Sequence, residues 1–308
     1  MCIRDSHAFS APPIGASITY KYIGNKKFEI TATLYRDCRG TGMSAPTLSM
    51  MCVGGNSKNL TPTLMNIKDI TPTCQSVGVL CNPPNTTISS GSAAIEEHIY
   101  ADTIDFGGSE SSYYSCGTIK LGVGNCCRNG AITTGAAGNY FWVTCTMELG
   151  KIKTNSSPVF SYPANLIASC NQPLYWSFIA KDTIDNDSLS YSFTDPLTSY
   201  TGKTAWGGGF SSQLPLTPYW PTGYDKSKGP KPDANPPIGI YLDPVSGMLI
   251  TTPSNCNEMS IIAIAVKEWR KDTTGKYIQI GEIVRDLQFF SQTVNNTTPT
   301  LSGTTQYS

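Results

Sequence analysis

The chain has 308 residues, of which 14% are charged and 39% hydrophobic, with 22 Lys and Arg against 22 Asp and Glu. A formal net charge of zero provides no long-range attraction to nucleic acid or to an anionic membrane, so we expect no nucleic-acid partner. The 11 cysteines exceed what a reduced cytosolic chain normally carries outside metal sites, and they indicate an exported, extracellular or cell-surface protein.

Both ends of the chain are expected to lie outside the fold. Residues 1–14 are expected to contain two such parts. The first resembles a translated sequencing-adapter scar, and the second resembles the last residues of a signal peptide. Discounting Cys2 with the scar leaves ten cysteines. Residues 293–308 have no periodic pattern and resemble a linker or a truncated end, so we expect further domains in the parent protein.

The first half, residues 15–160, predicts a cysteine-rich β-sandwich. Apolar and polar residues alternate through residues 27–36, and Gly24-Asn25 supplies a turn from a preceding strand at residues 18–23, which together predict a hairpin. Four further strands are expected, at residues 59–67, 95–106, 117–123 and 140–149.

A second β-sandwich is expected over residues 161–292, with the boundary near residue 160. Its longest predicted strands, residues 260–269 and 276–290, flank a polar connection suited to a hairpin. Shorter strands are expected at residues 189–193, 238–242 and 248–251. The longest apolar run, residues 261–266, is far shorter than the roughly 18 residues of a membrane helix, so we expect no transmembrane segment. The expected fold class is all-β, with two disulfide-stapled immunoglobulin-like β-sandwich domains.

The cysteine spacings favour disulfides over zinc, because none of them shows the usual two-residue gap of a zinc knuckle. The simplest local pairings are Cys38 with Cys52 and Cys74 with Cys81. Adjacent Cα atoms lie about 3.8 Å apart across a trans peptide, below the roughly 4.4 Å minimum of ordinary disulfides, so adjacent cysteines should bond to different partners. The expected disulfide cysteines are Cys38, Cys52, Cys74, Cys81, Cys116, Cys126, Cys127, Cys145, Cys170 and Cys256.

Four motifs in the first half carry a family resemblance. Ile-Thr-Tyr at 18–20, Tyr-Arg-Asp-Cys at 35–38, Glu-Glu-His-Ile-Tyr at 96–100 and Cys-Cys-Arg-Asn at 126–129 resemble the amino-terminal module of gliding motility-associated surface proteins exported by bacterial type IX secretion. The resemblance implies immunoglobulin-type β-sandwiches in a secreted, multi-domain adhesin or surface filament without catalytic activity.

The second half is similar to the cadherin-like or immunoglobulin-like repeats that accompany such modules, through residues 180–191 and 242–253. The related repeat usually has Asp-X-Asp-Gly-Asp-Ser-Leu, whereas this chain has one inserted residue and Asn186 in place of Gly. Asp182, Asp185 and Asp187 fall in this turn, where their carboxylates could bind calcium. The alternative is that they cap the turn. The sequence indicates no required cofactor, and calcium is the one candidate ion.

The connection between Phe193 and Ile238 is far longer than the roughly 12–15 residues beyond which loops are usually functional or disordered. It is rich in aromatic residues, which could bind a sugar face or a protein partner, or could pack the loop onto its own sandwich. The candidate ligand-binding residues are Trp206, Tyr219, Trp220 and Tyr224.

We find no catalytic motif in the sequence. No Gly-X-Ser-X-Gly elbow or glycine-rich phosphate loop occurs, and His98 is expected on a strand surface. The sequence therefore predicts a non-enzymatic secreted surface protein that acts in adhesion or as a structural spacer, with an extracellular protein or polysaccharide as partner. The alternative is a carbohydrate-binding module of a secreted carbohydrate-active protein.

Overall fold

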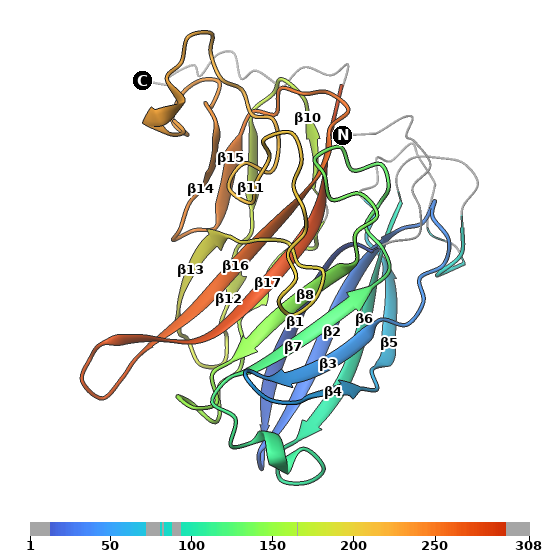
Figure 1. Ribbon diagram of the computed structural model, residues 1–308, viewed down its shortest axis with the longest axis vertical. Coiled ribbons are helices and arrows are strands. Elements are labelled where there is room, and N and C mark those ends of the chain that lie inside the picture. Colours follow the sequence, from blue (N-terminus) through green and yellow to red (C-terminus); the bar gives the residue numbers. More distant parts are fainter. Residues whose placement is uncertain (1–12, 72–80, 82, 88–93, 165, 294–308) are drawn as a thin grey trace, which may run out of the picture.

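The computed structural model describes residues 13–71, 81, 83–87, 94–164 and 166–293 (Figure 1). These residues form strands and two single-turn 3-10 helices, Ser111–Tyr113 and Lys226–Lys228, which confirms the all-β fold class. The strands are β1 (Pro13–Gly24), β2 (Lys27–Asp37), β3 (Thr47–Cys52), β4 (Ser57–Leu60), β5 (Thr63–Asp69), β6 (Ile95–Asp105), β7 (Ile119–Asn125), β8 (Phe141–Met147), β9 (Val159–Phe160), β10 (Leu166–Ser169), β11 (Leu174–Ser177), β12 (Ala180–Lys181), β13 (Ser188–Phe193), β14 (Ile240–Leu242), β15 (Met248–Thr251), β16 (Met259–Lys271) and β17 (Tyr277–Gln292).

The predicted hairpin is confirmed by the antiparallel pairing of β1 with β2. Gly24 pairs with Lys27, so the loop consists of Asn25 and Lys26, whose φ angles of 49° and 60° match the two positive φ values of a type I′ turn. The alternation in β2 places Phe28, Ile30, Ala32 and Leu34 in the core and the residues between them on the opposite face.

The largest sheet contains strands from both halves of the chain in the order β4-β3-β7-β8-β17-β1-β2-β6-β5. Along one edge β17 pairs antiparallel with β16, and β16 pairs on with β13. Along its other edge β17 pairs successively with β8 through residues 281–283, with β1 through residues 285–287, and in parallel with β10 through residues 289–292. The long strand β17 therefore connects all parts of this sheet.

β8 and β1 pair with successive positions along the same edge of β17. The strands that continue from β8 and those that continue from β1 therefore form two layers that face each other. Figure 1 shows β3 and β7 in front of β1 and β2, and β1 contacts both β7 and β8. Apolar side chains of both layers, among them Ile18, Phe28, Leu121 and Val143, belong to one buried core. This packing gives the first half its sandwich-like form.

The smaller sheet β11-β15-β14 lies beside the β13–β16 part of the large sheet, and β13 contacts β14. Tyr191, Ile240, Leu249 and Ile264 fill the space here and belong to the same buried core as the first half. Burial is almost continuous along β17, which is the pattern of a strand that is covered on both faces. Strands on both sides of residue 160 thus share one sheet and one core, and the division into two domains at that residue stays a prediction.

Candidate functional site

Two disulfides connect distant parts of the first half. Cys38 bonds to Cys81 and Cys52 bonds to Cys116, with Cα–Cα distances of 5.7 and 5.8 Å. The expected local pairings Cys38–Cys52 and Cys74–Cys81 are therefore wrong, and Cys74 itself lies outside the described residues. The reason is the strand pairing: β3 pairs with β7, which brings the end of β3 beside the residues that precede β7.

The remaining described cysteines differ in part from expectation. Cys126 and Cys127 bond to each other, because the peptide between them is cis and their Cα atoms are 3.1 Å apart, whereas the expectation of separate partners assumed a trans peptide. Cys170 and Cys256, which both belong to the expected disulfide cysteines, bond to each other in the second half. Cys145 is a free thiol, not a disulfide cysteine, since its side chain points from β8 into the apolar core. Burial raises the pKa of this thiol well above its usual value.

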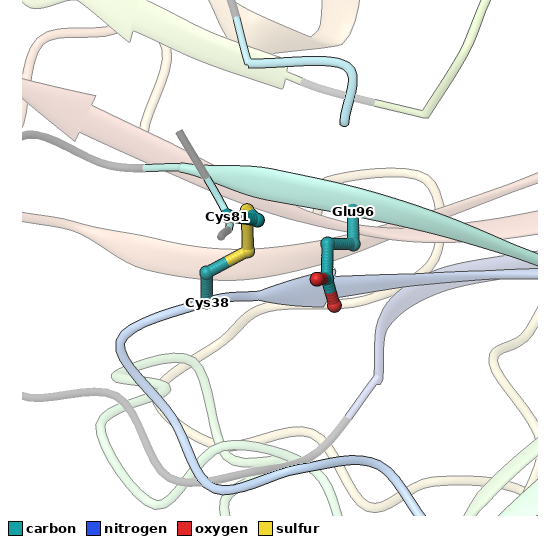
Figure 2. Close-up of side chains that lie close together, drawn as sticks. All are labelled: Cys38, Cys81 and Glu96. Atoms are coloured by element: carbon teal, nitrogen blue, oxygen red, sulfur yellow. A yellow bond between two sulfur atoms is a disulfide. The ribbon is translucent and has the colours of Figure 1, made fainter. Parts of the chain in front are cut away.

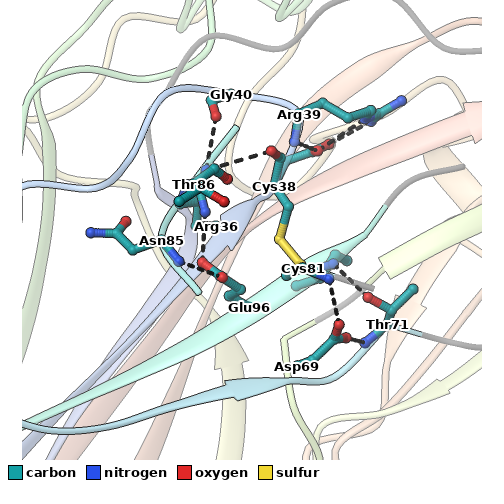
Figure 3. The surroundings of a disulfide bond; sticks show 12 residues. Arg36, Cys38, Arg39, Gly40, Asp69, Thr71, Cys81, Asn85, Thr86 and Glu96 are labelled. Carbon is teal, nitrogen blue, oxygen red and sulfur yellow. Dashed lines mark hydrogen bonds and ion pairs between the residues drawn. A yellow bond between two sulfur atoms is a disulfide. The ribbon is translucent and has the colours of Figure 1, made fainter. Parts of the chain in front are cut away.

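Beside the Cys38–Cys81 bridge, a buried arginine connects two loops (Figure 3). The Arg36 guanidinium pairs with Glu96 at 2.6 Å and donates to the carbonyls of Gly40, Thr41 and Thr86 at 2.8, 2.9 and 2.6 Å. Both side chains of the pair are at most 1% exposed. A desolvated guanidinium with this many acceptors fixes the two loops against the ends of β2 and β6.

His98 belongs to the same network and is fully buried, so its expected position on a strand surface is wrong. It shares the inner face of β6 with Glu96, and its Nε2 lies 2.9 Å from the Glu96 carboxylate. Burial lowers the pKa of His98, which favours a neutral imidazole. On the outer face of these strands, the Tyr35 hydroxyl donates to Glu97 at 3.0 Å. Two motifs of the family resemblance thus contribute to the packing of β2 against β6.

Glu96 also lies beside the bridge sulfurs, as Figure 2 shows, with one oxygen within 4.8 Å of both Cys38 and Cys81. A zinc or copper site at this position would need thiolates. The two sulfurs are bonded to each other, so this cluster is part of the structural network around the bridge.

In the acidic turn, Asp182 acts as a cap. Its carboxylate accepts from the backbone amides of Ile184, Asp185 and Asp187 at 3.2, 3.0 and 2.7 Å. Asn186 has a φ of 56°, a left-handed conformation that Asn and Gly both adopt, which explains why Asn serves where the related repeat usually has Gly. These contacts favour the turn-capping alternative.

Arg270 on β16 supplies a positive charge to this turn. Its Nε donates to Asp187 at 2.6 Å, its Nη2 lies 3.6 Å from Asp185, and Nη2 also donates to the side-chain Oδ1 of Asn155 at 2.8 Å. One guanidinium therefore already pairs with two of the three carboxylates proposed for calcium. Calcium binding at this turn stays the untested one of the two alternatives that the sequence offers.

The structure gathers a different set of three carboxylates from the one expected, Asp182, Asp187 and Glu268, without Asp185. One oxygen of each carboxylate lies within 4.8 Å of the others. Glu268 is 0% exposed, and the Asn155 amide donates to its Oε2 at 2.7 Å, while its Oε1 has no hydrogen-bond partner among the described residues. Burial, reinforced by the two aspartates, raises the pKa of Glu268 to about 9. This carboxyl therefore keeps its proton at neutral pH.

The long aromatic connection folds back on the strands. The rings of Trp220 and Tyr224 are 5.5 Å apart and inclined by 34°, and Lys226 and Lys231 lie over them at 5.6 and 5.7 Å. The backbone amide of Tyr219 donates to the Thr252 carbonyl at 2.7 Å, next to β15. The structure thus brings Trp220 and Tyr224 together as one partly buried ring pair.

Trp206 occupies a different environment, against a small apolar cluster formed by Ile132, Ala136, Met259 and Ile261. Its indole Nε1 is buried and has no hydrogen-bond partner within the described part of the chain. Trp206 therefore contributes mainly to packing.

Sequence reasoning missed Glu268, Arg270 and Arg285, three charged residues on the long strands β16 and β17. Glu268 and Arg285 are 0% and 5% exposed. A charged residue inside a strand that is otherwise buried is a signal that could have identified both.

Comparison of the chain with protein-family models, with curated proteins and with solved structures finds no match. Among the described residues, no helix has the length and apolar character required to cross a membrane.

Proposed function

We propose that the chain belongs to a secreted, non-enzymatic cell-surface protein of the gliding motility-associated, type IX-secreted class, in which it acts in adhesion or as a structural spacer. Its two halves, residues 15–160 and 161–292, serve as immunoglobulin-like β-sandwiches. The disulfides carry this proposal. Three bridges connect cysteines separated by 43, 64 and 86 residues, and such bridges persist in oxidising compartments outside the cytosol.

The interlocked sheet supports a spacer role. β17 pairs with β1, β8, β10 and β16, so a force applied along the chain meets pairings from both halves. The bridges Cys38–Cys81 and Cys170–Cys256 restrict the extension of each half further.

A second candidate function is that of a carbohydrate-binding module. The ring pair of Trp220 and Tyr224 supports it, because partly exposed aromatic rings beside lysines are suited to stack on a sugar ring. The ring pair lies in a connection whose backbone is paired with neighbouring segments by two isolated antiparallel β-bridges, Pro218 with Pro253 and Leu197 with Trp142. This backbone pairing would present the rings in one geometry.

Attachment of cells to surfaces under flow tests these roles. Deletion of the gene should reduce attachment, and the intact gene should restore it. If residues 15–292 act as a spacer, an unrelated tandem of β-sandwich domains of similar length should also restore attachment. If they are adhesive, only the native residues should do so. Normal attachment of the deletion strain, with the protein confined to the cell interior, would contradict the proposal.

The carbohydrate alternative has its own test in Trp220→Ala, with Trp206→Ala as the matched control. Glycan-array binding by the purified chain should be lost in Trp220→Ala and retained in Trp206→Ala, because Trp206 packs against the cluster around Met259. Equal glycan binding by both variants and the native chain would exclude the ring pair as a sugar site.

A further inference from the structure

A pocket of about 260 Å³ lies on the outer face of the large sheet, apart from the acidic turn and the aromatic connection. It is lined by residues of β1, β2, β5, β6 and β17, among them Lys68 of β5, and by residues 159–163, which include β9. This volume is slightly below the roughly 300–1,000 Å³ of pockets for drug-sized ligands, so it is suited to a smaller molecule, such as a single sugar ring.

The strand register explains why polar side chains gather here. Arg285 is directly opposite Ser17, and Ser17 is directly opposite Thr33, so these three residues form a row across β17, β1 and β2. Thr19 and Thr31 form the next row on the same face. Directly opposed residues of antiparallel strands point to the same side of the sheet, which places a guanidinium beside four hydroxyls.

Arg285 is a buried cation that has no carboxylate partner among the described residues. The residue is 5% exposed, its Nη1 donates to the carbonyl of Tyr162, and its guanidinium carbon lies 4.0 Å from the centre of the Phe160 ring. Its Nε is buried without a hydrogen-bond partner, and Arg285 forms no salt bridge in the part of the chain that the structure describes.

Glu97 acts electrostatically on Arg285 from beyond ion-pair distance and accepts from the Tyr35 hydroxyl at 3.0 Å. Burial lowers the pKa of Arg285 to about 10, which is still well above neutral pH, so the guanidinium is charged. A desolvated charge without a counterion is costly, and an incoming anion would remove that cost.

The hydroxyls around Arg285 are available to a ligand. Across the described residues, Ser17, Thr19, Thr31 and Thr33 have no hydrogen bond from their side chains, although Ser17 is only 5% exposed. Each hydroxyl can donate one hydrogen bond and accept others, which matches the hydroxyls of a sugar.

We propose that this pocket binds a carboxylated sugar, one hexuronate unit of an acidic polysaccharide, with the carboxylate on Arg285 and the ring hydroxyls on the Ser and Thr side chains. The planar guanidinium matches a carboxylate geometrically, whereas a neutral sugar would leave the buried charge unpaired. The proposal goes beyond adhesion or spacing and does not depend on either.

The test is calorimetric titration of the full chain with methyl glucuronide, methyl glucoside and sodium acetate. Methyl glucuronide should bind saturably, and the other two at least about tenfold more weakly, since each lacks one half of the recognised chemistry. Arg285→Lys should weaken methyl glucuronide binding by about tenfold or more, because an ammonium cannot form the paired contact.

Thr33→Val provides a second variant that keeps the shape of the side chain and removes the hydroxyl, so it tests the pocket even if Arg285→Lys fails to fold. It should weaken methyl glucuronide binding several-fold. Thr103→Val is the matched control, because Thr103 is exposed on the same face of β6 as Glu97 and lies outside the pocket. This variant should bind methyl glucuronide as tightly as the native chain does.

Three results would overturn the proposal. They are the absence of methyl glucuronide binding at millimolar concentration, equal binding of methyl glucoside or acetate, and unchanged binding in folded Thr33→Val.

Discussion

Arg128 and Asp286 form a buried, two-pronged ion pair that connects the first half of the chain to β17. Nη1 donates to Oδ1 at 2.9 Å and Nη2 to Oδ2 at 2.6 Å, and the two side chains are 2% and 1% exposed. Nη2 also donates to the Leu197 carbonyl at 3.2 Å, at the start of the aromatic connection. One residue of the Cys-Cys-Arg-Asn motif therefore joins three distant segments.

We expect Asp286→Ala to destabilise the chain strongly, because it leaves the Arg128 guanidinium buried without a counterion. Removal of one partner of a buried pair typically costs about 3–5 kcal/mol. The free energy of unfolding from urea titration, monitored by tryptophan fluorescence, measures this cost.

Asp195→Ala is the matched control, since Asp195 pairs with Lys203 at a site where the two side chains are 31% and 68% exposed. Its free energy of unfolding should change by no more than about 1 kcal/mol. Equal effects of the two variants would contradict a structural role for the buried pair.

Cys145 should be the buried free thiol. Burial raises the pKa of Cys145, and the side chain lies in the core, so an alkylating reagent should not modify it in the folded chain. Peptide mapping after alkylation should show label on the Cys145 peptide only when the reagent is added in denaturant. Label on this peptide from the folded chain, or a disulfide at Cys145, would show that the core is packed differently.

Glu268 should make stability depend on pH. Its pKa is raised from 4.5 to about 9, so the folded chain binds a proton that the unfolded chain releases between these values. The stabilisation from the protonated carboxyl is fully present below about pH 4.5 and is lost as pH rises through about 9. Urea titrations across this range should therefore show falling stability.

Glu268→Gln should remove this part of the pH dependence, because an amide resembles the protonated carboxyl and does not titrate. Glu282→Gln serves as the comparison. Glu282 lies on β17, and burial raises the pKa of its carboxyl as well. Parallel stability curves for the native chain and Glu268→Gln between pH 5 and 9 would rule out a proton on Glu268.

Calcium should have little effect on the acidic turn. Asp182 already caps three amides and Arg270 pairs with Asp187, so the turn has its partners without a metal ion. Thermal unfolding should be the same in millimolar calcium and in chelator. A clear rise of the melting temperature in calcium, lost in Asp187→Asn, would establish the site that the sequence suggested.

The sequence predicts elements well where a local pattern determines them. The β1–β2 hairpin follows from alternation and from Asn25 in the turn, and both are local. β3 was missed because Thr47–Cys52 does not alternate cleanly, and residues 59–67, expected as one strand, divide into the end of β4 and most of β5.

Contacts between distant residues were not predictable in the same way. The Cys52–Cys116 bridge depends on the pairing of β3 with β7, and the Arg270 contact with Asp187 depends on the pairing of β13 with β16. Turn capping by Asp182 was one of two stated alternatives because its partners lie within five residues. The Arg285 pocket combines residues of six strands, β1, β2, β5, β6, β9 and β17, and no local pattern marks it.

Disulfide mapping of the protein taken from intact cells is the most direct test of an oxidised, surface-exposed module. Surface protein should be released after free thiols are blocked, digested without reduction, and examined by mass spectrometry. We expect linked peptides for Cys38–Cys81, Cys52–Cys116 and Cys170–Cys256. Recovery of these six cysteines as free thiols, or of the protein from the cytosol alone, would contradict the central claim.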